Sequence, residues 1–293
     1  MSALTRAADV VVAEHAARSR SFTAEGVTSS VLEAAGAAGD PVVCLHGVPT
    51  SSFLYRKVVP ALGHRGVRAF AFDLPGMGLA GRPDDFDYTW TGLGAFAARA
   101  VDALGIDRYH LLVHDIGGPV GFELTARHSG RVRTLTVLNT MASVASFRKP
   151  WPMAPFAVPG IGDAWLAGTP AWMFVKLMRH IGIYDQRAVD DAELAAHLVL
   201  LRRTDHGSAF LKIMRNFETT VAKEELYREV LADPSRPRQV LWGVHDRALP
   251  SSTHGADIAA LTGSPLMALP GRHFVQEDNA AAIADAVAAI TVR

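Results

Sequence analysis

The sequence contains a single cysteine, Cys44, among its 293 residues. One thiol excludes a disulfide within the chain and a zinc site built from several cysteines, and it fits a reducing cytosol. No stretch approaches the roughly 18 uninterrupted apolar residues that a transmembrane helix needs. The first 20 residues carry Asp9, Glu14, His15 and three arginines, unlike the apolar core of a signal peptide. We therefore expect a cytoplasmic protein that does not associate with membranes.

The sequence also lacks an excess of charge of either sign. It has 29 Lys and Arg against 29 Asp and Glu, so no basic face for nucleic acid is expected. Its 12 histidines form no His-x-x-x-His helix, and its aspartates form no cluster, so we expect neither a metal site nor a cofactor. The apolar fraction of 49% and the charged fraction of 20% are typical of one large globular domain, or of a core with a smaller subdomain.

Short apolar runs alternate with longer helical patterns along most of the chain. Such runs, rich in Val, Leu, Ile and Phe, are typical of strands buried on both faces, and an earlier stretch at 22–33 could add antiparallel edge strands. The expected strands are residues 41–45, 67–72, 109–113, 132–138, 239–242 and 266–269, and the expected helices are 53–64, 91–105, 118–128, 253–261 and 276–290. This alternation predicts an α/β fold with a mostly parallel central sheet flanked by helices.

The alternation stops between residues 141 and 229. Prolines and tryptophans punctuate the first part of this segment, and helical patterns at 192–203 and 209–217 follow, with no convincing strand. We interpret residues 141–229 as an inserted helical cap, and residues 1–140 and 230–293 as the core. Ligands bind open α/β sheets at the carboxyl edge, so a cap placed there would close the site.

The segment 111–122 joins a buried strand to a helix through small residues. This is the setting of a nucleophile elbow, in which the residue at the apex is pushed out above the sheet. The apex residue here is Asp115 instead of the usual serine, and the nearby helix N-terminus favours its ionised form. A helix N-cap is the alternative interpretation of this aspartate.

Three further segments follow strands. In the loop after residue 45, the backbone N–H of Val48 could pair with that of Ile116 to form an oxyanion hole. Asp246 and His273 lie in loops after the strands at 239–242 and 266–269, where each could instead be a cap or an ordinary loop residue. Together, Asp115, Asp246 and His273 occur in the order nucleophile, acid, base, which favours a catalytic triad.

Four motifs carry a resemblance to a known family. They are residues 46–56, residues 72–83, residues 114–118 and residues 271–278. In these motifs the sequence resembles the α/β-hydrolase superfamily, in particular its haloalkane dehalogenase and epoxide hydrolase branch. The resemblance covers nearly all of the chain outside the cap and implies an α/β-hydrolase fold.

An aspartate nucleophile implies attack on a saturated carbon that bears a leaving group. The product would be an alkyl ester on Asp115, and His273, oriented by Asp246, would activate the water that hydrolyses it. The N–H groups of Val48 and Ile116 would hold the resulting oxyanion. In some dehalogenases the acid instead follows the strand at 132–138, but Asn139 and Thr140 stand there, which favours Asp246.

The sequence departs from both branches of the family at the leaving group. Dehalogenases usually carry Asn or Glu at the position of Val48 and Trp at that of Ile116, and neither residue found here has a side-chain donor. Trp165 or Trp172 in the cap could replace the missing donor, or could simply form the pocket wall. Epoxide hydrolases usually have two cap tyrosines, of which Tyr184 is a candidate, whereas Tyr227 is expected outside the pocket.

These features lead to three functional hypotheses. The first is an epoxide hydrolase, or a related hydrolase of a hydrophobic small molecule, that uses water as co-substrate. The second is a haloalkane dehalogenase with an atypical halide site. The third is a non-catalytic binder of a hydrophobic ligand on the same fold. The sequence leaves the oligomeric state open.

Overall fold

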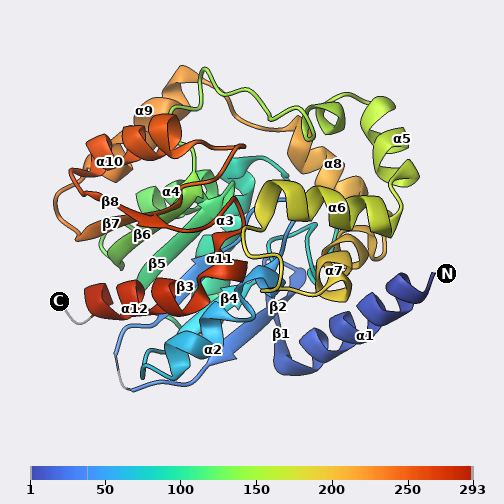
Figure 1. Ribbon diagram of the computed structural model, residues 1–293. Helices are drawn as coiled ribbons and strands as arrows, with labels where there is room; N and C mark the ends of the chain where they lie inside the picture. The colour runs from blue at the N-terminus through green and yellow to red at the C-terminus, as the bar shows by residue number, and fades with distance from the viewer. Residues whose placement is uncertain (1, 38, 292–293) are drawn as a thin grey trace.

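The computed structural model describes residues 2–37 and 39–291, and it contains one eight-stranded sheet (Figure 1). The strand order is β1-β2-β4-β3-β5-β6-β7-β8, in which β1 and β2 are antiparallel to their neighbours and the others run parallel. The strands are β1 Ser19–Ala24, β2 Val27–Ala34, β3 Val42–Leu45, β4 Ala69–Phe72, β5 Tyr109–Asp115, β6 Val132–Thr140, β7 Arg238–Gly243 and β8 Leu266–Leu269. The predicted α/β fold and its antiparallel edge are therefore confirmed.

Helices cover both faces of this sheet (Figure 1). Outside the segment between β6 and β7 they are α1 Ala3–Arg18, α2 Val58–Gly63, α3 Trp90–Ala103, α4 Gly117–Arg127, α10 Ala256–Thr262, α11 Val275–Asp278 and α12 Ala280–Thr291. Side chains alternate across the buried strand β5, so Leu111 and Val113 join the core under α3 and α4, while Leu112 joins the core under α2 and α12. None of the helices described is long and apolar enough to cross a membrane.

The segment between β6 and β7 is helical, as the sequence predicts. It contains α5 Ile161–Gly168, α6 Ala171–Gly182, α7 Asp191–Arg202, α8 Ser208–Arg215 and α9 Val221–Ala232. Helices α5 to α8 lie together beside the sheet in Figure 1, whereas α9 packs against α4 and α10. The division into a core and a cap at 141–229 remains a prediction, and α9 extends across its second boundary.

The first helix, α1, has no counterpart among the sequence-based expectations. Its alanine-rich sequence favours a helix, and the side chain of Ser2 caps it by accepting a hydrogen bond from the N–H of Thr5. The helix packs against α7. The first helix thus supports α7, which belongs to the segment between β6 and β7.

Candidate active site

Asp115 stands at the apex of a sharp turn between β5 and α4. Its φ of 53° lies in the left-handed region, which non-glycine residues adopt mainly at strained functional turns. The turn needs the glycines that follow. A Cβ on Gly117 would come within 2.5 Å of the carbonyl oxygen of Leu45, and one on Gly118 within 2.0 Å of the hydroxyl of Thr140. The small residues therefore let the helix start directly against the neighbouring strands.

Backbone N–H groups converge on the carboxylate of Asp115. The N–H of Val48 donates to Oδ1 at 2.8 Å, and the N–H of Ile116 also interacts with the carboxylate. The loop approaches so closely that a Cβ on Gly47 would lie 2.2 Å from Oδ1. This arrangement places both predicted oxyanion donors at one carboxyl group, where they would equally face the carbonyl oxygen of an ester formed on Asp115.

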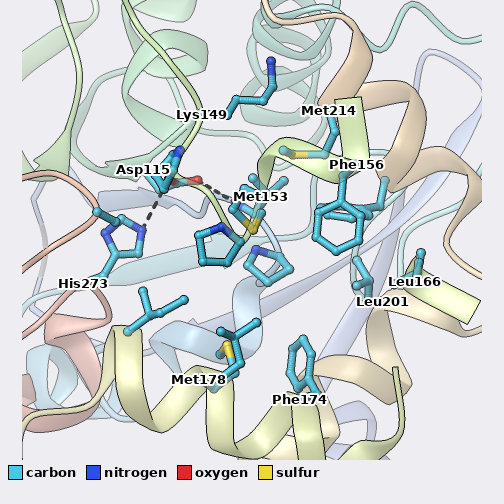
Figure 2. Close-up of a pocket in the computed structure, with 18 of the residues that line it drawn as sticks. Asp115, Lys149, Met153, Phe156, Leu166, Phe174, Met178, Leu201, Met214 and His273 are labelled. Carbon is cyan, nitrogen blue, oxygen red and sulfur yellow. Dashed lines mark hydrogen bonds and ion pairs between the residues drawn. The ribbon is translucent and has the colours of Figure 1, made fainter. Parts of the chain in front are cut away.

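His273 and Asp246 complete a hydrogen-bonded line with Asp115. Nδ1 of His273 lies 2.8 Å from Oδ2 of Asp246, and Nε2 lies 3.4 Å from Oδ2 of Asp115 (Figure 2). The other Asp246 oxygen accepts from the N–H groups of Ala248 and Leu249 at 2.7 and 3.0 Å. All three side chains follow the carboxyl ends of parallel strands, so the structure brings together residues that lie up to 158 positions apart.

The three groups hold complementary charges. Burial alone would lower the pKa of His273, but the adjoining carboxylates of Asp246 and Asp115 raise it to about 10. Burial opposes ionisation of Asp115 and Asp246 as well, yet contact with His273 leaves the pKa of each carboxyl below its ordinary value. The resting site thus contains an imidazolium between two carboxylates.

Two polar residues that support this line were not predicted from the sequence. Asn139, at the end of β6, donates from Nδ2 to Oδ2 of Asp246 at 2.8 Å and accepts the N–H of Gly243 through Oδ1 at 2.9 Å. Nε2 of His114 lies 2.8 Å from the carbonyl oxygen of His273. Both contacts join segments more than 100 residues apart, so no local pattern reveals them.

Asp115 and His273 open into a cavity with a mainly apolar lining (Figure 2). One wall is the loop after β3 with Val48 and Pro49, and the other comes from the helical segment after β6. This segment contributes aromatic, leucine and methionine side chains, among them Phe156, Trp165, Leu166, Phe174, Met178, Leu201, Phe210 and Met214. A hydrophobic small molecule of irregular shape suits such a wall, because methionine side chains adapt to it.

The structure separates the three predicted pocket residues. Trp165 lines the cavity. Trp172 does not, being 57% exposed with the ammonium of Lys176 5.2 Å from its ring centroid. Tyr184 is 46% exposed and stacks on His245, because Asp278 binds the backbone N–H of Tyr184 and holds this turn away from the cavity.

Tyr227 is also absent from the cavity lining, but it is buried and not external. Its hydroxyl donates to Glu123 at 3.2 Å, between α9 and α4. No tyrosine lines the cavity among the residues that the structure describes. The cavity instead contains Lys149, which the sequence patterns do not single out because it lies in an irregular loop with no motif around it.

Comparison with known proteins agrees with this geometry. The family described as the α/β-hydrolase fold matches residues 40–181. Haloalkane dehalogenase 2 of Mycobacterium tuberculosis is 28% identical over 261 residues, covering 85% of this chain and 87% of the relative. A cis-3-alkyl-4-alkyloxetan-2-one decarboxylase of Xanthomonas campestris is 28% identical over 289 residues, covering 92% of this chain and 93% of the relative.

Solved structures show the same fold. The haloalkane dehalogenase DbeA of Bradyrhizobium elkani superposes with a TM-score of 0.77 at 23% identity, covering 94% of this chain and 98% of that one. A DbjA structure gives a TM-score of 0.75 at 26% identity, with the same coverage. Haloalkane dehalogenases thus occur among both the sequence relatives and the structural neighbours.

Proposed function

We propose that this chain, which has an α/β-hydrolase fold and haloalkane dehalogenases among its relatives, is a hydrolase that forms an alkyl ester on Asp115. The observation that carries this proposal is the position of Asp115 at the elbow. Its carboxylate contacts the N–H of Val48 on one oxygen and His273 on the other. A carboxylate so placed can attack a saturated carbon, whereas no hydroxyl stands at the apex for a serine-type reaction.

The first step forms one bond and breaks another. An oxygen of Asp115 attacks the substrate carbon as the bond from that carbon to its leaving group breaks. Esterification removes the negative charge of Asp115, so the pKa of His273 falls once the step is complete. The loss of this charge prepares His273 to act as a base.

The second step releases the product. Neutral His273 takes a proton from water, and the resulting hydroxide attacks the carbonyl carbon of the ester. The N–H groups of Val48 and Ile116 hold the oxyanion. Collapse of the intermediate breaks the bond between the carbonyl carbon and the alkoxy oxygen, releases an alcohol and restores Asp115. Asp246 stabilises the imidazolium through its 2.8 Å contact with Nδ1.

An epoxide is the substrate class that we favour. Its opening leaves an alkoxide that needs a proton, and no tyrosine of the described cavity lining can supply one. The imidazolium of His273, with its pKa raised to about 10, lies beside Asp115 and can donate that proton. The transfer leaves His273 neutral, as the hydrolytic step requires.

Haloalkane dehalogenation is the alternative that the relatives' names suggest. A departing halide in an apolar cavity needs hydrogen-bond donors. Val48 and Ile116 offer none from their side chains, and Trp165 is the one tryptophan in the described lining. The non-catalytic alternative is disfavoured by the complete line of Asp115, His273 and Asp246.

A four-membered lactone is a second candidate substrate. The oxetan-2-one decarboxylase of Xanthomonas campestris matches this chain over 92% of its length, and a carboxylate leaving group requires no proton donor. Attack of Asp115 on the saturated ring carbon that is bonded to the ring oxygen would break that carbon–oxygen bond. The lactone would open to an ester on Asp115 with a free carboxylate. Loss of carbon dioxide with expulsion of Asp115 would then give an alkene without consuming water.

Mass spectrometry of the intact protein separates these possibilities. The enzyme is mixed with an epoxide, a bromoalkane or an oxetan-2-one and quenched in acid within the first turnover. We expect the epoxide to add its whole mass to Asp115, whereas a bromoalkane would add its mass less hydrogen bromide. An adduct that forms in the parent protein within the first turnover and is absent from Asp115→Ala supports the ester, and with the bromoalkane, whose leaving group needs no proton, the adduct should persist in His273→Gln. Full turnover by Asp115→Ala would overturn the proposal.

A further inference from the structure

Lys149 is the cation of the cavity that the proposed reaction does not use. Asp115, His273 and Lys149 are the charged residues in the described lining, and the rest of that lining is almost wholly apolar. The ammonium of Lys149 lies 4.1 Å from the ring centroid of Phe217, which also lines the cavity. No ion pair joins Lys149 to a carboxylate within residues 2–37 and 39–291.

Lys149 stands without an ion-pair partner within the described residues, although the cavity as a whole is not positively charged. The imidazolium of His273 lies between the carboxylates of Asp115 and Asp246, so these three groups leave one negative charge at the reacting end. Lys149 has only the face of Phe217, and that ring is held in place by Trp90 at 4.9 Å between centroids. An aromatic face attracts a cation but leaves its charge uncompensated. An anionic group entering the cavity would meet this charge in a surrounding of low polarity, where the attraction is strong.

The side chain does not point at the reacting atoms. Figure 2 shows the nitrogen of Lys149 directed away from the carboxylate of Asp115. The residue is partly exposed, whereas Asp115 and His273 are buried. Lys149 is thus placed to contact a part of the substrate remote from the carbon that Asp115 attacks, near enough to solvent for a charged group to stay partly hydrated.

We propose that Lys149 is an anion-binding subsite and that the preferred substrates are apolar chains with the reacting carbon at one end and a carboxylate at the other. This inference rests on the proposed function for the reacting end. The single ammonium suits a monoanion, and the leucine, methionine and phenylalanine wall suits the chain between the two ends. The length of the apolar part of the substrate determines whether its carboxylate can reach Lys149 while its reacting carbon lies at Asp115.

Kinetics on matched substrates test the subsite. The substrates are ω-epoxy fatty acids of increasing chain length and their methyl esters, which differ only in the charge of the remote end. With the carboxylates, Lys149→Met is expected to lower kcat/KM roughly tenfold or more, as for loss of a charged hydrogen bond. Lys149→Arg should retain most of the activity. With the methyl esters, the loss in Lys149→Met should be much smaller than with the carboxylates, because these substrates have no charge at the remote end.

Lys176→Met is the matched control. Lys176 also lies over an aromatic ring, that of Trp172, at 5.2 Å, but outside the cavity. Its substitution removes the same charge from the protein without affecting the subsite. Equal kcat/KM losses in Lys149→Met and Lys176→Met would assign the effect to general electrostatics and overturn the proposal.

A binding measurement separates this proposal from the proposed reaction. Calorimetry with an unreactive saturated fatty acid reports the subsite whether or not Asp115 forms an ester. Binding that weakens in Lys149→Met and persists in Asp115→Ala supports the subsite. Equal affinity of Lys149→Met and the parent protein, or equal loss of carboxylate and ester turnover, contradicts it. Absence of any adduct on Asp115 with retained fatty-acid binding would instead contradict only the reaction.

Discussion

At the scale of single residues, the carboxylate of Asp115 is ionised although it is buried. A buried carboxylate is costly unless donors compensate it, and here the N–H of Val48 and the imidazolium of His273 do so. In the proposed reaction, the same contacts would position the group for attack. Asp246 is satisfied in a similar way by Asn139 and by two backbone N–H groups. Reactivity therefore depends on small distances around these carboxylates, and two substitutions test this.

Gly47→Ala should disable the site although it replaces none of the titratable residues. The added Cβ would lie 2.2 Å from Oδ1 of Asp115, so the carboxylate or the loop must move. Because a misplacement of about 1 Å can reduce turnover roughly 100-fold, we expect a loss of kcat of this size. Gly130→Ala is the control, since a Cβ added at Gly130 would meet nothing within 4 Å. Equal kcat values for both variants would contradict the close approach.

Asn139→Leu should affect stability and catalysis together. It removes a donor to Asp246 and leaves the N–H of Gly243 unpaired, which costs about 1–3 kcal/mol in the free energy of unfolding. The Asp246 carboxylate also loses orientation, so kcat should fall. Gln239→Leu is the comparison, because it removes hydrogen bonds to Thr136 and Ala286 away from the site. An unchanged kcat in Asn139→Leu would assign Asn139 a purely structural role.

At the scale of elements, a buried ion-pair cluster ties the site to the segment after β6. Glu277 on α11 binds Arg56 at 2.6 Å and Lys57 at 3.0 Å, and Arg56 in turn binds Glu193 on α7 at 2.9 Å. Burial alone would raise the pKa of Glu277, but Arg56 holds it far below its ordinary value. The cluster thus joins the helix that follows His273 to the helices that cover the cavity.

Glu277→Gln tests this connection. Removing the charge of Glu277 leaves two cations of this largely buried cluster, Arg56 and Lys57, with one carboxylate, that of Glu193, so the free energy of unfolding should fall by about 3 kcal/mol. Asp285→Asn on α12 breaks an exposed pair with Arg65, and its unfolding curve should overlay that of the parent protein. Urea titrations of both variants decide the matter, and coincident curves would refute a structural role for the cluster.

At the scale of the whole molecule, the features that could be predicted from the sequence are those that follow from the periodicity of apolar residues and from the order of the segments along the chain. The six mutually parallel strands, the antiparallel edge and the helices after these strands follow from apolar patterns, and the places of Asp115, Asp246 and His273 follow from the positions of the strands. The outward turn of Tyr184 depends on Asp278, and the burial of Tyr227 between α9 and α4 depends on Glu123; both partners are distant in sequence. Tertiary packing determines the positions of these two side chains, so the local sequence around them does not predict these positions.

The contacts of His273 with Asp115 and Asp246 also make stability depend on pH. The folded pKa of His273, about 10, lies above its ordinary value near 6.5. Its contribution is therefore complete below about pH 6.5 and is lost as the pH rises towards 10. Urea unfolding between these values should show a decline that is smaller in His273→Gln. Parallel declines in the two proteins would mean that His273 is not held as an imidazolium.

The covalent role of Asp115 is tested most directly by a single turnover in water enriched in heavy oxygen. With enzyme in excess over an epoxide, water attacks the ester carbonyl, so the label should enter the carboxyl group of Asp115 and be found by mass analysis of its peptide. The first product molecules should contain ordinary oxygen from Asp115. Label in the first product, with none in the peptide, would show direct attack of water on the substrate and contradict the account.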